Sequence, residues 1–377
     1  MKKIIILTST RADFGKMKSL IFSLKKNKKR YNVTILITGM HMLPKFGNTY
    51  KEILKYFRTG LMMFKNQKFG DPLEIILANT ISKLSKIFAK INPDLVITHG
   101  DRVETLATAI TGSLNHYLVG HIEGGELSGT IDDTIRHSVT KLSHVHFVSS
   151  NKAKKRVINL GEIPKNVYNI GSSDLDSVKE KNLPVLSVVK KRYDITFKEY
   201  GILIWHPVTS EIKNLSNETI KLINFLKKKG DNFIVIYPNN DPGSHEILKI
   251  YDKLKSKNFK IFPSLRFNYF ISLLKNAKYI IGNSSCAIYE APYFKIPSIN
   301  IGTRQKGRLL STSVINCKPN QKDILYSIKI LYSKRFQNKL KKSLNPYGPK
   351  GAVKKIIKVL EKNSEIKINK HFYDISI

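Results

Sequence analysis

The chain has 377 residues, with 65 Lys and Arg against 28 Asp and Glu and a formal net charge of +37. Its length suggests two domains of about 100–200 residues each, and a hydrophobic content of 41% excludes a disordered or low-complexity protein. Two cysteines, Cys286 and Cys317, exclude a disulfide framework, and no apolar run reaches the about 20 residues that a membrane span needs.

The first apolar run, residues 4–7, has only four residues before Thr8, which is too short for a secretory signal. We therefore expect a soluble, cytoplasmic protein. Similar short runs alternate with helix-length amphipathic segments through the first half of the chain. Strands are expected over residues 3–7, 33–37, 94–98, 117–120 and 144–148, and helices over 15–26, 72–91, 103–115 and 133–142. This alternation predicts a parallel sheet with helices on both faces.

A second series of the same kind begins near residue 200. It predicts strands over 202–205, 233–237, 260–262, 279–281 and 298–301, and helices over 216–229, 244–257, 266–276 and 287–295. The Lys-rich stretch 177–199 is interpreted as the connection between domains, and the amphipathic segment 351–362 as the end of the folded part. The prediction is two doubly wound, Rossmann-like α/β domains facing each other across a cleft. They would comprise residues 1–185 and 186–362, followed by a loosely attached tail, 363–377.

Polar clusters follow the predicted strands at their carboxyl ends, where open parallel sheets bind ligands. A single cluster of this kind is usually an ordinary loop, but eight in series predict one ligand-binding cleft. The clusters are Thr8–Gly15, Thr38–His41, His99–Arg102, His121–Glu126, His206–Pro207, Pro238–Asp241, Gly282–Ser285 and Gly302–Arg304.

Carboxylates are concentrated in one part of this acid-poor chain. Six of the 33 residues from Asp101 to Asp133 are acidic, against 28 of 377 overall. Asp101 and Glu123 directly follow strands, which favours a functional role, because charged side chains are costly there otherwise. Paired carboxylates suit general acid/base chemistry. For Asp132 and Asp133, capping of the next helix is an alternative that stays open.

The second half offers groups that suit a phosphate. Ser284 and Ser285 end a predicted strand and start a predicted helix, whose N-terminus would favour an anion. Arg304 and Arg308, with Lys306, have the charge to neutralise a diphosphate. Glu290 is either a ribose ligand or an ordinary exposed helix residue, and the strand-end position of His206 favours function over a core role.

Several cofactor motifs are absent from the sequence. There is no Walker lysine loop, no GxGxxG, no CxxC and no HExxH. We therefore expect no metal site and no cofactor, which leaves acid/base chemistry on a nucleotide-linked substrate.

The net positive charge can be interpreted in two ways. It consists of 54 Lys spread along the whole chain and only 11 Arg, whereas a nucleic-acid reader usually concentrates Arg and aromatic residues on one face. A compositional bias towards Lys is the favoured explanation, and nucleic-acid binding is the rival from another class. Five Arg lie in the polar motifs: Arg11, Arg102, Arg136, Arg304 and Arg308.

At these motifs the chain resembles the hydrolysing UDP-N-acetylglucosamine 2-epimerases over about residues 1–362. The matching motifs are Thr10–Gly15 (TRADFG), Thr38–His41 (TGMH), Gly100–Glu104 (GDRVE), His121–Glu126 (HIEGGE), Ile135–Ser138 (IRHS), His206–Pro207 (HP), Gly282–Ser285 (GNSS) and Arg304–Arg308 (RQKGR). The GMH and GDRxE forms resemble the hydrolysing branch more than the non-hydrolysing one. The resemblance implies a glycosyltransferase-B-like fold.

The resemblance also implies a reaction and roles for individual residues. UDP would leave by anti elimination to a 2-acetamidoglucal, and water would then add to release the free 2-epimer. Catalytic carboxylates would lie in the N-terminal domain, and the C-terminal domain would bind UDP. The implied catalytic residues are Asp101, Glu123, Asp132, Arg136 and His206. The implied substrate and UDP ligands are Arg11, His41, Ser284, Ser285, Glu290, Arg304 and Arg308.

Some choices stay open at this stage. Non-hydrolysing relatives carry Glu where this chain has Asp132, so either Asp132 or Asp133 is the operative acid. The sugar is UDP-N-acetylglucosamine or its 2,4-diacetamido-2,4,6-trideoxy analogue, as in sialic or legionaminic acid precursor synthesis. The alternatives are a non-hydrolysing epimerase and a glycosyltransferase of the same fold. The resemblance further implies a homo-oligomer that binds no nucleic acid and no membrane.

Overall fold

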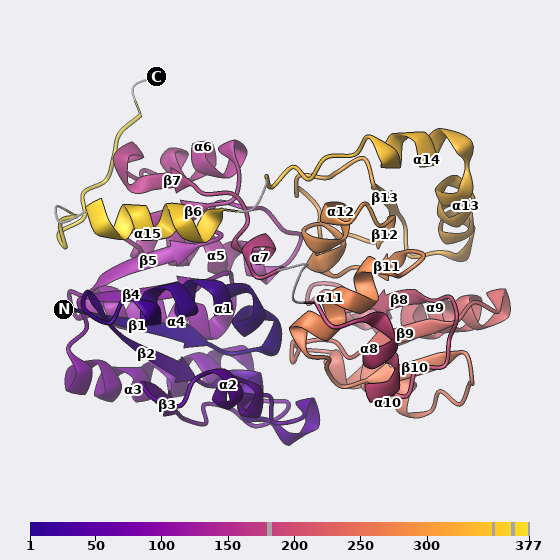
Figure 1. Cartoon of the computed structure of the whole chain (residues 1–377), viewed down its shortest axis with the longest axis horizontal. Helices are drawn as coiled ribbons and strands as arrows, with labels where there is room; N and C mark the ends of the chain where they lie inside the picture. Colours follow the sequence, from indigo (N-terminus) through magenta and orange to yellow (C-terminus); the bar gives the residue numbers. More distant parts are fainter. Residues whose placement is uncertain (179–182, 349–350, 363–365, 376–377) are drawn as a thin grey trace. The chain divides into compact units, whose positions relative to one another are not determined.

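The structure is a computed structural model that describes residues 1–178, 183–348, 351–362 and 366–375. The chain forms two compact units (Figure 1). Unit 1 comprises Met1–Glu126, Asp132–Ser177 and Tyr347–Ile377, and unit 2 comprises Leu127–Ile131 and Val178–Pro346.

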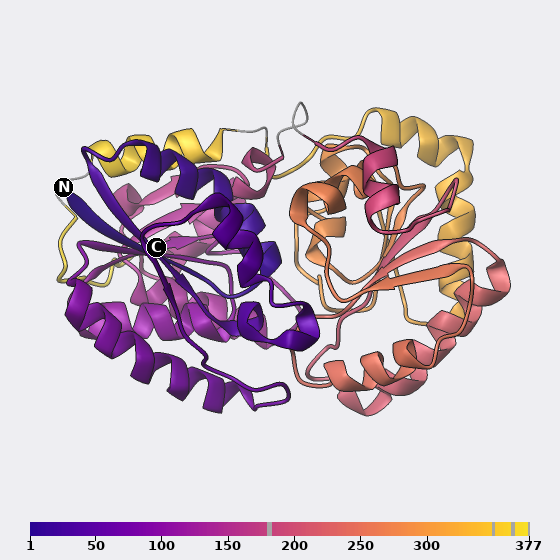
Figure 2. The same cartoon turned by 60° about the horizontal axis from the view of Figure 1, so that its bottom comes forward.

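Unit 1 is built on a parallel seven-stranded sheet in the order β3-β2-β1-β4-β5-β6-β7. Its strands are β1 (Lys2–Thr8), β2 (Tyr31–Ile37), β3 (Leu61–Met63), β4 (Leu95–His99), β5 (Leu118–Ile122), β6 (Val145–Val148) and β7 (Val167–Asn169). Helices cover both faces of the sheet (Figure 2). They are α1 (Arg11–Lys26), α2 (Tyr50–Tyr56), α3 (Leu73–Ile91), α4 (Val103–Leu114), α5 (Ile131–Leu142), α6 (Asn151–Asn159), α7 (Ser173–Asp176) and α15 (Ala352–Lys362).

Unit 2 repeats this plan with a parallel six-stranded sheet in the order β10-β9-β8-β11-β12-β13. The strands are β8 (Gly201–Ile204), β9 (Phe233–Ile236), β10 (Phe259–Phe262), β11 (Ile280–Gly282), β12 (Ser298–Ile301) and β13 (Val314–Cys317). The helices are α8 (Leu186–Arg192), α9 (Leu215–Lys229), α10 (Ser244–Asp252), α11 (Phe267–Lys275), α12 (Glu290–Tyr293), α13 (Gln321–Tyr332) and α14 (Lys334–Lys341). The predicted pair of doubly wound α/β domains is therefore confirmed.

The central strands are apolar throughout because helices cover both faces of each sheet. In β1, Ile4 and Ile6 pack into one core cluster of unit 1, while Ile5 and Leu7 pack into another on the opposite face. This follows from the alternation of side chains along a strand. The predicted strands and most predicted helices are found within a few residues of their expected ends. Within the described part of the chain, no helix is long and apolar enough to cross a bilayer.

The sequence missed the three strands β3, β7 and β13. Each lies at the edge of its sheet and has only three or four residues. Strands of three or four residues are too short to show a clear alternation or an apolar run of typical strand length. The predicted helix over 287–295 is wrong: a 3₁₀ turn, η6 (Ser285–Ala287), is followed by the four-residue α12. A helix over the whole stretch would place Pro292 in its interior, where proline lacks the N–H needed for the hydrogen bond to the residue four positions earlier.

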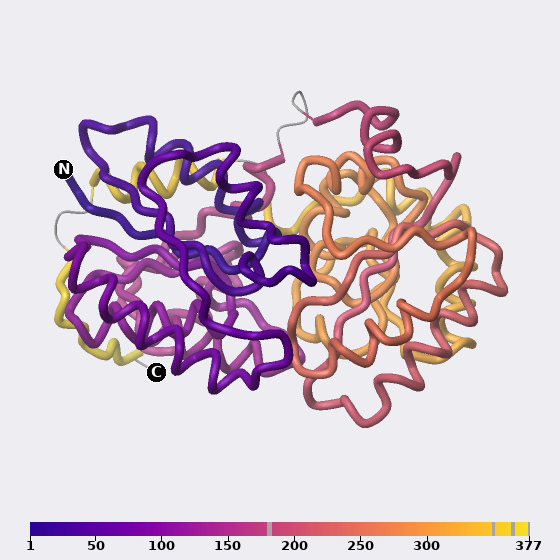
Figure 3. Tube along the Cα trace, turned by 90° about the horizontal axis from the view of Figure 1, so that it is seen from below, coloured from indigo at the N-terminus to yellow at the C-terminus, as the bar shows by residue number. Residues whose placement is uncertain are grey.

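The carboxyl-terminal part of the chain returns to unit 1, which corrects the predicted domain boundaries. Helix α15, expected in the second domain, places Ala352, Val353, Ile356 and Leu360 in the core cluster that contains β1, and Figure 1 shows it among the elements of unit 1. Of the predicted loose tail, residues 363–365 and 376–377 lie outside the described part. Residues 366–375 lie against unit 1 rather than loose (Figure 3).

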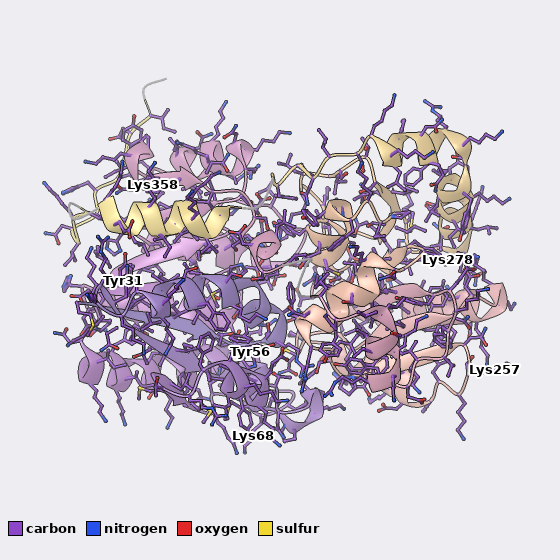
Figure 4. All side chains as sticks on the ribbon, in the orientation of Figure 1. Tyr31, Tyr56, Lys68, Lys257, Lys278 and Lys358 are labelled. Atoms are coloured by element: carbon purple, nitrogen blue, oxygen red, sulfur yellow. The ribbon has the colours of Figure 1, made fainter. Side chains whose placement is uncertain are left out.

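The lysines are distributed as the composition suggested. In Figure 4 the labelled Lys68 and Lys358 lie in unit 1, and Lys257 and Lys278 in unit 2. All four are exposed; Lys358 lies on α15 and the other three lie in separate loops. These positions agree with a dispersed charge rather than a single basic face.

Gly282 at the end of β11 allows a test of the unit 2 fold. Its φ is 131°, and a Cβ there would lie 2.0 Å from the carbonyl oxygen of Ile204. We expect Gly282→Ala to destabilise unit 2 by about 3 kcal/mol, because backbone must shift and the conformation itself is strained. Urea unfolding followed by the fluorescence of Trp205, the only tryptophan in the sequence, measures this.

Gly302→Ala is the matched control. Gly302 also has a positive φ of 78°, but a Cβ there meets no heavy atom within 4 Å. We therefore expect only the conformational cost of about 1 kcal/mol. Equal shifts in the two unfolding midpoints would show that the contact with Ile204 is unimportant.

Candidate active site

Each sheet has a point where neighbouring strands lead into connections that run in opposite directions, and open α/β sheets bind ligands there. In unit 1 this point lies between β1 and β4, and in unit 2 between β8 and β11. The polar clusters predicted from the sequence follow these strands: Arg11 and Asp101 in unit 1, and His206 and Ser284 in unit 2.

A buried ionic cluster centred on His99 lies at the switch point of unit 1. His99 ends β4, and its Nδ1 lies 3.3 Å from Asp13 Oδ1. Its Nε2 lies 3.3 Å from Glu123 Oε2 and 3.8 Å from Asp174 Oδ1. Asp174 also pairs with Lys16, at 2.8 Å between Oδ2 and Nζ. Three carboxylates therefore surround one imidazole at the ends of β1, β4 and β5.

These carboxylates keep His99 protonated. Burial lowers the pKa of the imidazole, but the interactions with Asp13 and Asp174 and the charge of Glu123 outweigh that effect and raise it to about 10. For Asp174, burial raises the pKa, whereas Lys16 and His99 lower it to about 2. Near neutral pH the cluster therefore contains an imidazolium, with a proton on each ring nitrogen.

Glu123 is held in an unusual backbone conformation. Its φ of 71° lies in the left-handed region, which non-glycine residues rarely adopt. Its N–H donates to the carbonyl of Phe147 in β6, at 2.9 Å. This bond and the pairing with His99 direct the side chain of Glu123 towards the end of β4.

The second carboxylate, Asp101, is paired with a buried arginine. The Arg136 guanidinium on α5, only 1% exposed, contacts Asp101 Oδ2 and donates to the carbonyl of Glu126 at 3.1 Å. It also lies 3.5 Å from Asp133 Oδ1. Arg136 thus fixes Asp101 while its own helix supplies a further acid. Within unit 1 the structure therefore brings together Asp101, Glu123 and Arg136 as three of the predicted catalytic residues.

The beginning of α5 contains the two neighbouring acids Asp132 and Asp133. The helix begins at Ile131, so Asp132 and Asp133 lie in its first turn rather than at the N-cap. Both are half-buried. Asp133 pairs within its own helix, with Arg136 and with His137, whose Nε2 is 3.7 Å from Oδ2. Asp133 therefore pairs with two residues of its own helix, and the choice between Asp132 and Asp133 as the operative acid stays a prediction.

The helix α2, which the sequence did not predict, holds Arg11. Glu52 Oε2 on α2 lies 3.0 Å from Arg11 Nε. Arg11 begins α1, which Thr10 caps by accepting from the N–H of Asp13 at 3.1 Å. Asp13 in turn accepts from the N–H of Ser9. This reciprocal cap places Arg11 and Asp13 at the end of β1.

His41, predicted to bind substrate, is placed differently. Its side chain is fully buried, with Nε2 3.1 Å from Thr8 Oγ1 and Nδ1 2.7 Å from Thr49 Oγ1. Burial lowers its pKa to about 3. A neutral ring with both nitrogens bonded inside the fold links the end of β1 to the start of α2, and the contact of His41 with substrate stays a prediction.

In unit 2, His206 follows β8 and is locked to the end of β11. Its N–H donates to Asn283 Oδ1 at 2.7 Å, and Asn283 Nδ2 donates back to the His206 carbonyl at 2.8 Å. Its Nδ1 accepts from the N–H of Asn239 at 3.1 Å. The neutral ring therefore carries its proton on Nε2, as the hydrogen-bond donor of the side chain.

The predicted phosphate site differs in the structure, because short turns rather than one long helix follow β11. Ser284 and Ser285 follow β11 and are half-buried, but they lead into short turns with little helix dipole. Phosphate binding here would depend on hydroxyl and backbone donors. Glu290 is buried, which excludes the reading as an ordinary exposed helix residue.

The basic loop after β12 is anchored to the same strand end. Arg304 donates to the Asn283 carbonyl at 3.3 Å, and the buried Gln305 does so at 2.9 Å. Arg308 donates to Tyr289 Oη at 2.6 Å and lies over that ring. The loop also pairs with residues 127–131, where the Gly129 N–H donates to the Arg304 carbonyl. Unit 2 thus gathers His206, Ser284 and Arg304 around Asn283, while Arg308 contacts Tyr289.

Sequence reasoning missed several residues of this site. Lys16, Glu52 and Asp174 carry no motif, and they lie far along the chain from the groups that they pair with. His99 and Asp13 lay inside predicted motifs but were not singled out. The signal for them was a charged or polar residue at a strand end. Among the described residues, no three His, Cys, Asp or Glu side chains are placed to hold a metal ion.

Two doubly wound parallel units, each with charged and polar groups at its switch point, define a glycosyltransferase-B-like protein. The chain belongs to the UDP-N-acetylglucosamine 2-epimerase family, whose sequence profile matches residues 23–361.

Relatives and solved structures agree. A Neisseria meningitidis serogroup B protein named UDP-N-acetylglucosamine 2-epimerase is 44% identical over 328 residues, which cover 87% of each chain. A Campylobacter jejuni protein named GDP/UDP-N,N'-diacetylbacillosamine 2-epimerase (hydrolyzing) is 37% identical over 386 residues, 99% of each. The crystal structure of a UDP-GlcNAc 2-epimerase from Neisseria meningitidis bound to UDP-GlcNAc matches with a TM-score of 0.79 at 21% identity, covering 96% of this chain and 100% of that one.

Proposed function

We propose that this protein is a hydrolysing 2-epimerase that converts a UDP-linked 2-acetamido sugar into UDP and the free 2-epimer. One observation carries the proposal: two carboxylates, Asp101 and Glu123, follow the adjacent strands β4 and β5, and each is paired with a buried cation. Such a pair suits a reaction that moves a proton at one carbon while positive charge develops at the next.

The chemistry follows from the substrate. The C2 proton has no adjacent carbonyl, so its removal must be coupled to breaking of the C1–O bond to UDP. The C2–H and C1–O bonds break, a C1=C2 double bond forms, and the electron pair leaves with the diphosphate. Water then adds its oxygen to C1, and a proton returns to C2 on the opposite face. The products are UDP and the free sugar inverted at C2.

We assign the sugar chemistry to unit 1. Asp101, Glu123 and Asp132 supply the proton transfers and stabilise the oxocarbenium-like charge at C1. His99 pairs with Glu123 and Arg136 pairs with Asp101, and these contacts orient the two acids. Arg11, fixed by Glu52, supplies positive charge for the departing diphosphate.

We assign UDP binding to unit 2. Ser284, Ser285 and the Arg304 and Arg308 guanidinium groups suit the diphosphate. The buried Glu290 suits ribose hydroxyls, whose hydrogens it would accept. His206 offers an Nε2–H donor, which suits the oxygen of the leaving phosphate.

Two features support hydrolysis rather than epimerisation with UDP retained. The GMH and GDRxE motifs resemble the hydrolysing branch, and the Campylobacter relative is named as hydrolysing. We propose UDP-N-acetylglucosamine as the substrate, because the Neisseria relative has the higher identity of the two and is named for that sugar. The 2,4-diacetamido-2,4,6-trideoxy analogue is the alternative, and either product would suit synthesis of sialic-acid-like sugars.

Product analysis tests this function. The protein is incubated separately with UDP-N-acetylglucosamine and with the diacetamido analogue, and the products are followed by NMR. We expect UDP and a free sugar inverted at C2 in equal amounts from one of them, and a rate at least about 100-fold lower for Asp101→Asn. A 2-epimer still attached to UDP would show the non-hydrolysing reaction instead, and no product from either substrate would refute the proposal.

A further inference from the structure

The carboxyl-terminal residues 366–375 form a strap along unit 1, although they contain no helix or strand. In Figure 3 this yellow segment lies beside magenta parts of the same unit. Its contacts are with the end of α5, with His144 just before β6, and with the turn after α6, all within unit 1.

Lys370 in the strap caps the carboxyl end of α5. Its Nζ donates to the carbonyls of Lys141 at 2.5 Å, Ser143 at 2.7 Å and Thr140 at 3.3 Å. The last four carbonyls of a helix lack partners within the helix, and a cation there also compensates the helix dipole. An ammonium group from the tail therefore adds a second cation to this helix end, beside Lys141 in the last turn of α5.

The same ammonium group is tied to a buried acid beneath the helix. Lys370 Nζ lies 2.6 Å from Glu162 Oε2, whose side chain is 2% exposed. Glu162 also accepts from His146 Nε2 in β6, at 2.8 Å, and pairs with Lys141 Nζ at 2.8 Å. Removing one charged group from a buried network leaves the others uncompensated. The network therefore favours a single position of the Lys370 ammonium group.

Further contacts hold the strap on either side of Lys370. His144 Nε2 bonds the carbonyl of Ile368 at 3.0 Å, and the Tyr373 N–H donates to the Gly161 carbonyl at 3.0 Å. The Phe372 ring packs on Gly161, where a Cβ would lie 2.4 Å from it, and Lys141 Nζ lies over the ring. The strap is therefore held in place on both sides of Lys370, the residue that caps α5.

The capped end of α5 lies one turn from its functional residue. Thr140 Oγ1 donates to the carbonyl of Arg136 at 3.1 Å, and Arg136 holds Asp101. We propose that residues 366–375 position α5 through Lys370, so that Lys370 is a positioning residue for the Arg136–Asp101 pair. For its effect on turnover, this inference rests on the proposed function.

The test compares Lys370→Met, which keeps the aliphatic stem, with Lys367→Met, which removes an exposed lysine of the same strap. In Lys370→Met we expect kcat to fall about tenfold with KM within twofold, because Arg136 and Asp101 lose alignment while the UDP ligands in unit 2 are untouched. Amide hydrogen exchange over Arg136–Ser143 should become at least about tenfold faster, and that over α1 should not change. Lys367→Met should match the wild type in all three.

A double-mutant cycle separates positioning from general destabilisation. If Lys370 acts through Arg136, adding Lys370→Met to an Arg136→Lys background should change kcat by less than twofold. A fully additive loss, or unchanged exchange in α5, would overturn the proposal. If the wild type releases no UDP from any substrate, the proposed function fails, but the exchange measurement still decides whether the strap holds α5.

Discussion

Replacing Glu123 with glutamine is expected to lower kcat by about 1000-fold while leaving the dissociation constant for UDP within threefold. The substitution keeps the shape of the side chain but removes the charge that pairs with His99 at 3.3 Å. It removes a proton acceptor and a stabilising charge together, and each kind of loss typically costs about 10²–10³-fold. UDP affinity should persist because its proposed ligands belong to unit 2.

Steady-state UDP release and calorimetric titration with UDP measure the two quantities. Glu74→Gln, which changes an exposed glutamate at the start of α3 in the same unit, is the matched control and should behave as the wild type. If Glu123→Gln kept more than a third of the wild-type kcat, Glu123 would have no catalytic role.

Replacing His99 with glutamine is expected to have the largest effect on stability. The substitution leaves Asp13, Glu123 and Asp174 near one another without the imidazolium between them. Loss of one partner from a buried charge cluster costs about 3–5 kcal/mol. The loss in the free energy of unfolding of unit 1 is measured in urea at pH 7, with hydrogen exchange of the β4 and β5 amides as the readout. His245→Gln, an exposed histidine that pairs with Glu246, should cost little.

The same cluster predicts how stability depends on pH. The pKa of His99 is raised from 6.5 to about 10 in the folded protein, so its contribution is complete below pH 6.5 and disappears as the pH rises through about 10. The pKa of Asp174 is lowered from 3.8 to about 2, so its contribution is present above pH 3.8 and lost as the pH falls through about 2. Wild-type unit 1 should therefore weaken between pH 7 and pH 10, and His99→Gln should lack that part of the decline. Parallel slopes for the two proteins would contradict the charge assigned to His99.

The sequence predicted those parts of the site that depend on local pattern. Asp101 and Glu123 follow apolar runs closely in the sequence. Because the carboxyl ends of parallel strands share one edge of a sheet, the strand boundaries alone place both carboxylates at the same edge. The same reasoning placed His206 and Ser284 at the carboxyl ends of strands in unit 2. The family resemblance, rather than the pattern, supplied the substrate and the residue roles.

What the sequence could not predict depends on contacts between distant segments. Asp174 reaches His99 from the short helix α7, and Lys370 reaches the end of α5 from the tail, without any repeated spacing. His41 lies in a motif like the others, and nothing in that motif predicts that its ring is buried between Thr8 and Thr49. The apolar pattern of residues 287–295 led to the wrong prediction of one helix, because this stretch contains Pro292 and forms only short turns.

The most direct test of hydrolytic epimerisation through elimination is the reaction in D₂O, followed by proton NMR. The account predicts UDP and a free 2-epimer in equal amounts, with one deuterium at C2 in every product molecule, because the proton that leaves C2 is replaced from solvent after UDP departs. A free sugar that keeps its original proton at C2, or an inverted sugar still linked to UDP, would contradict it.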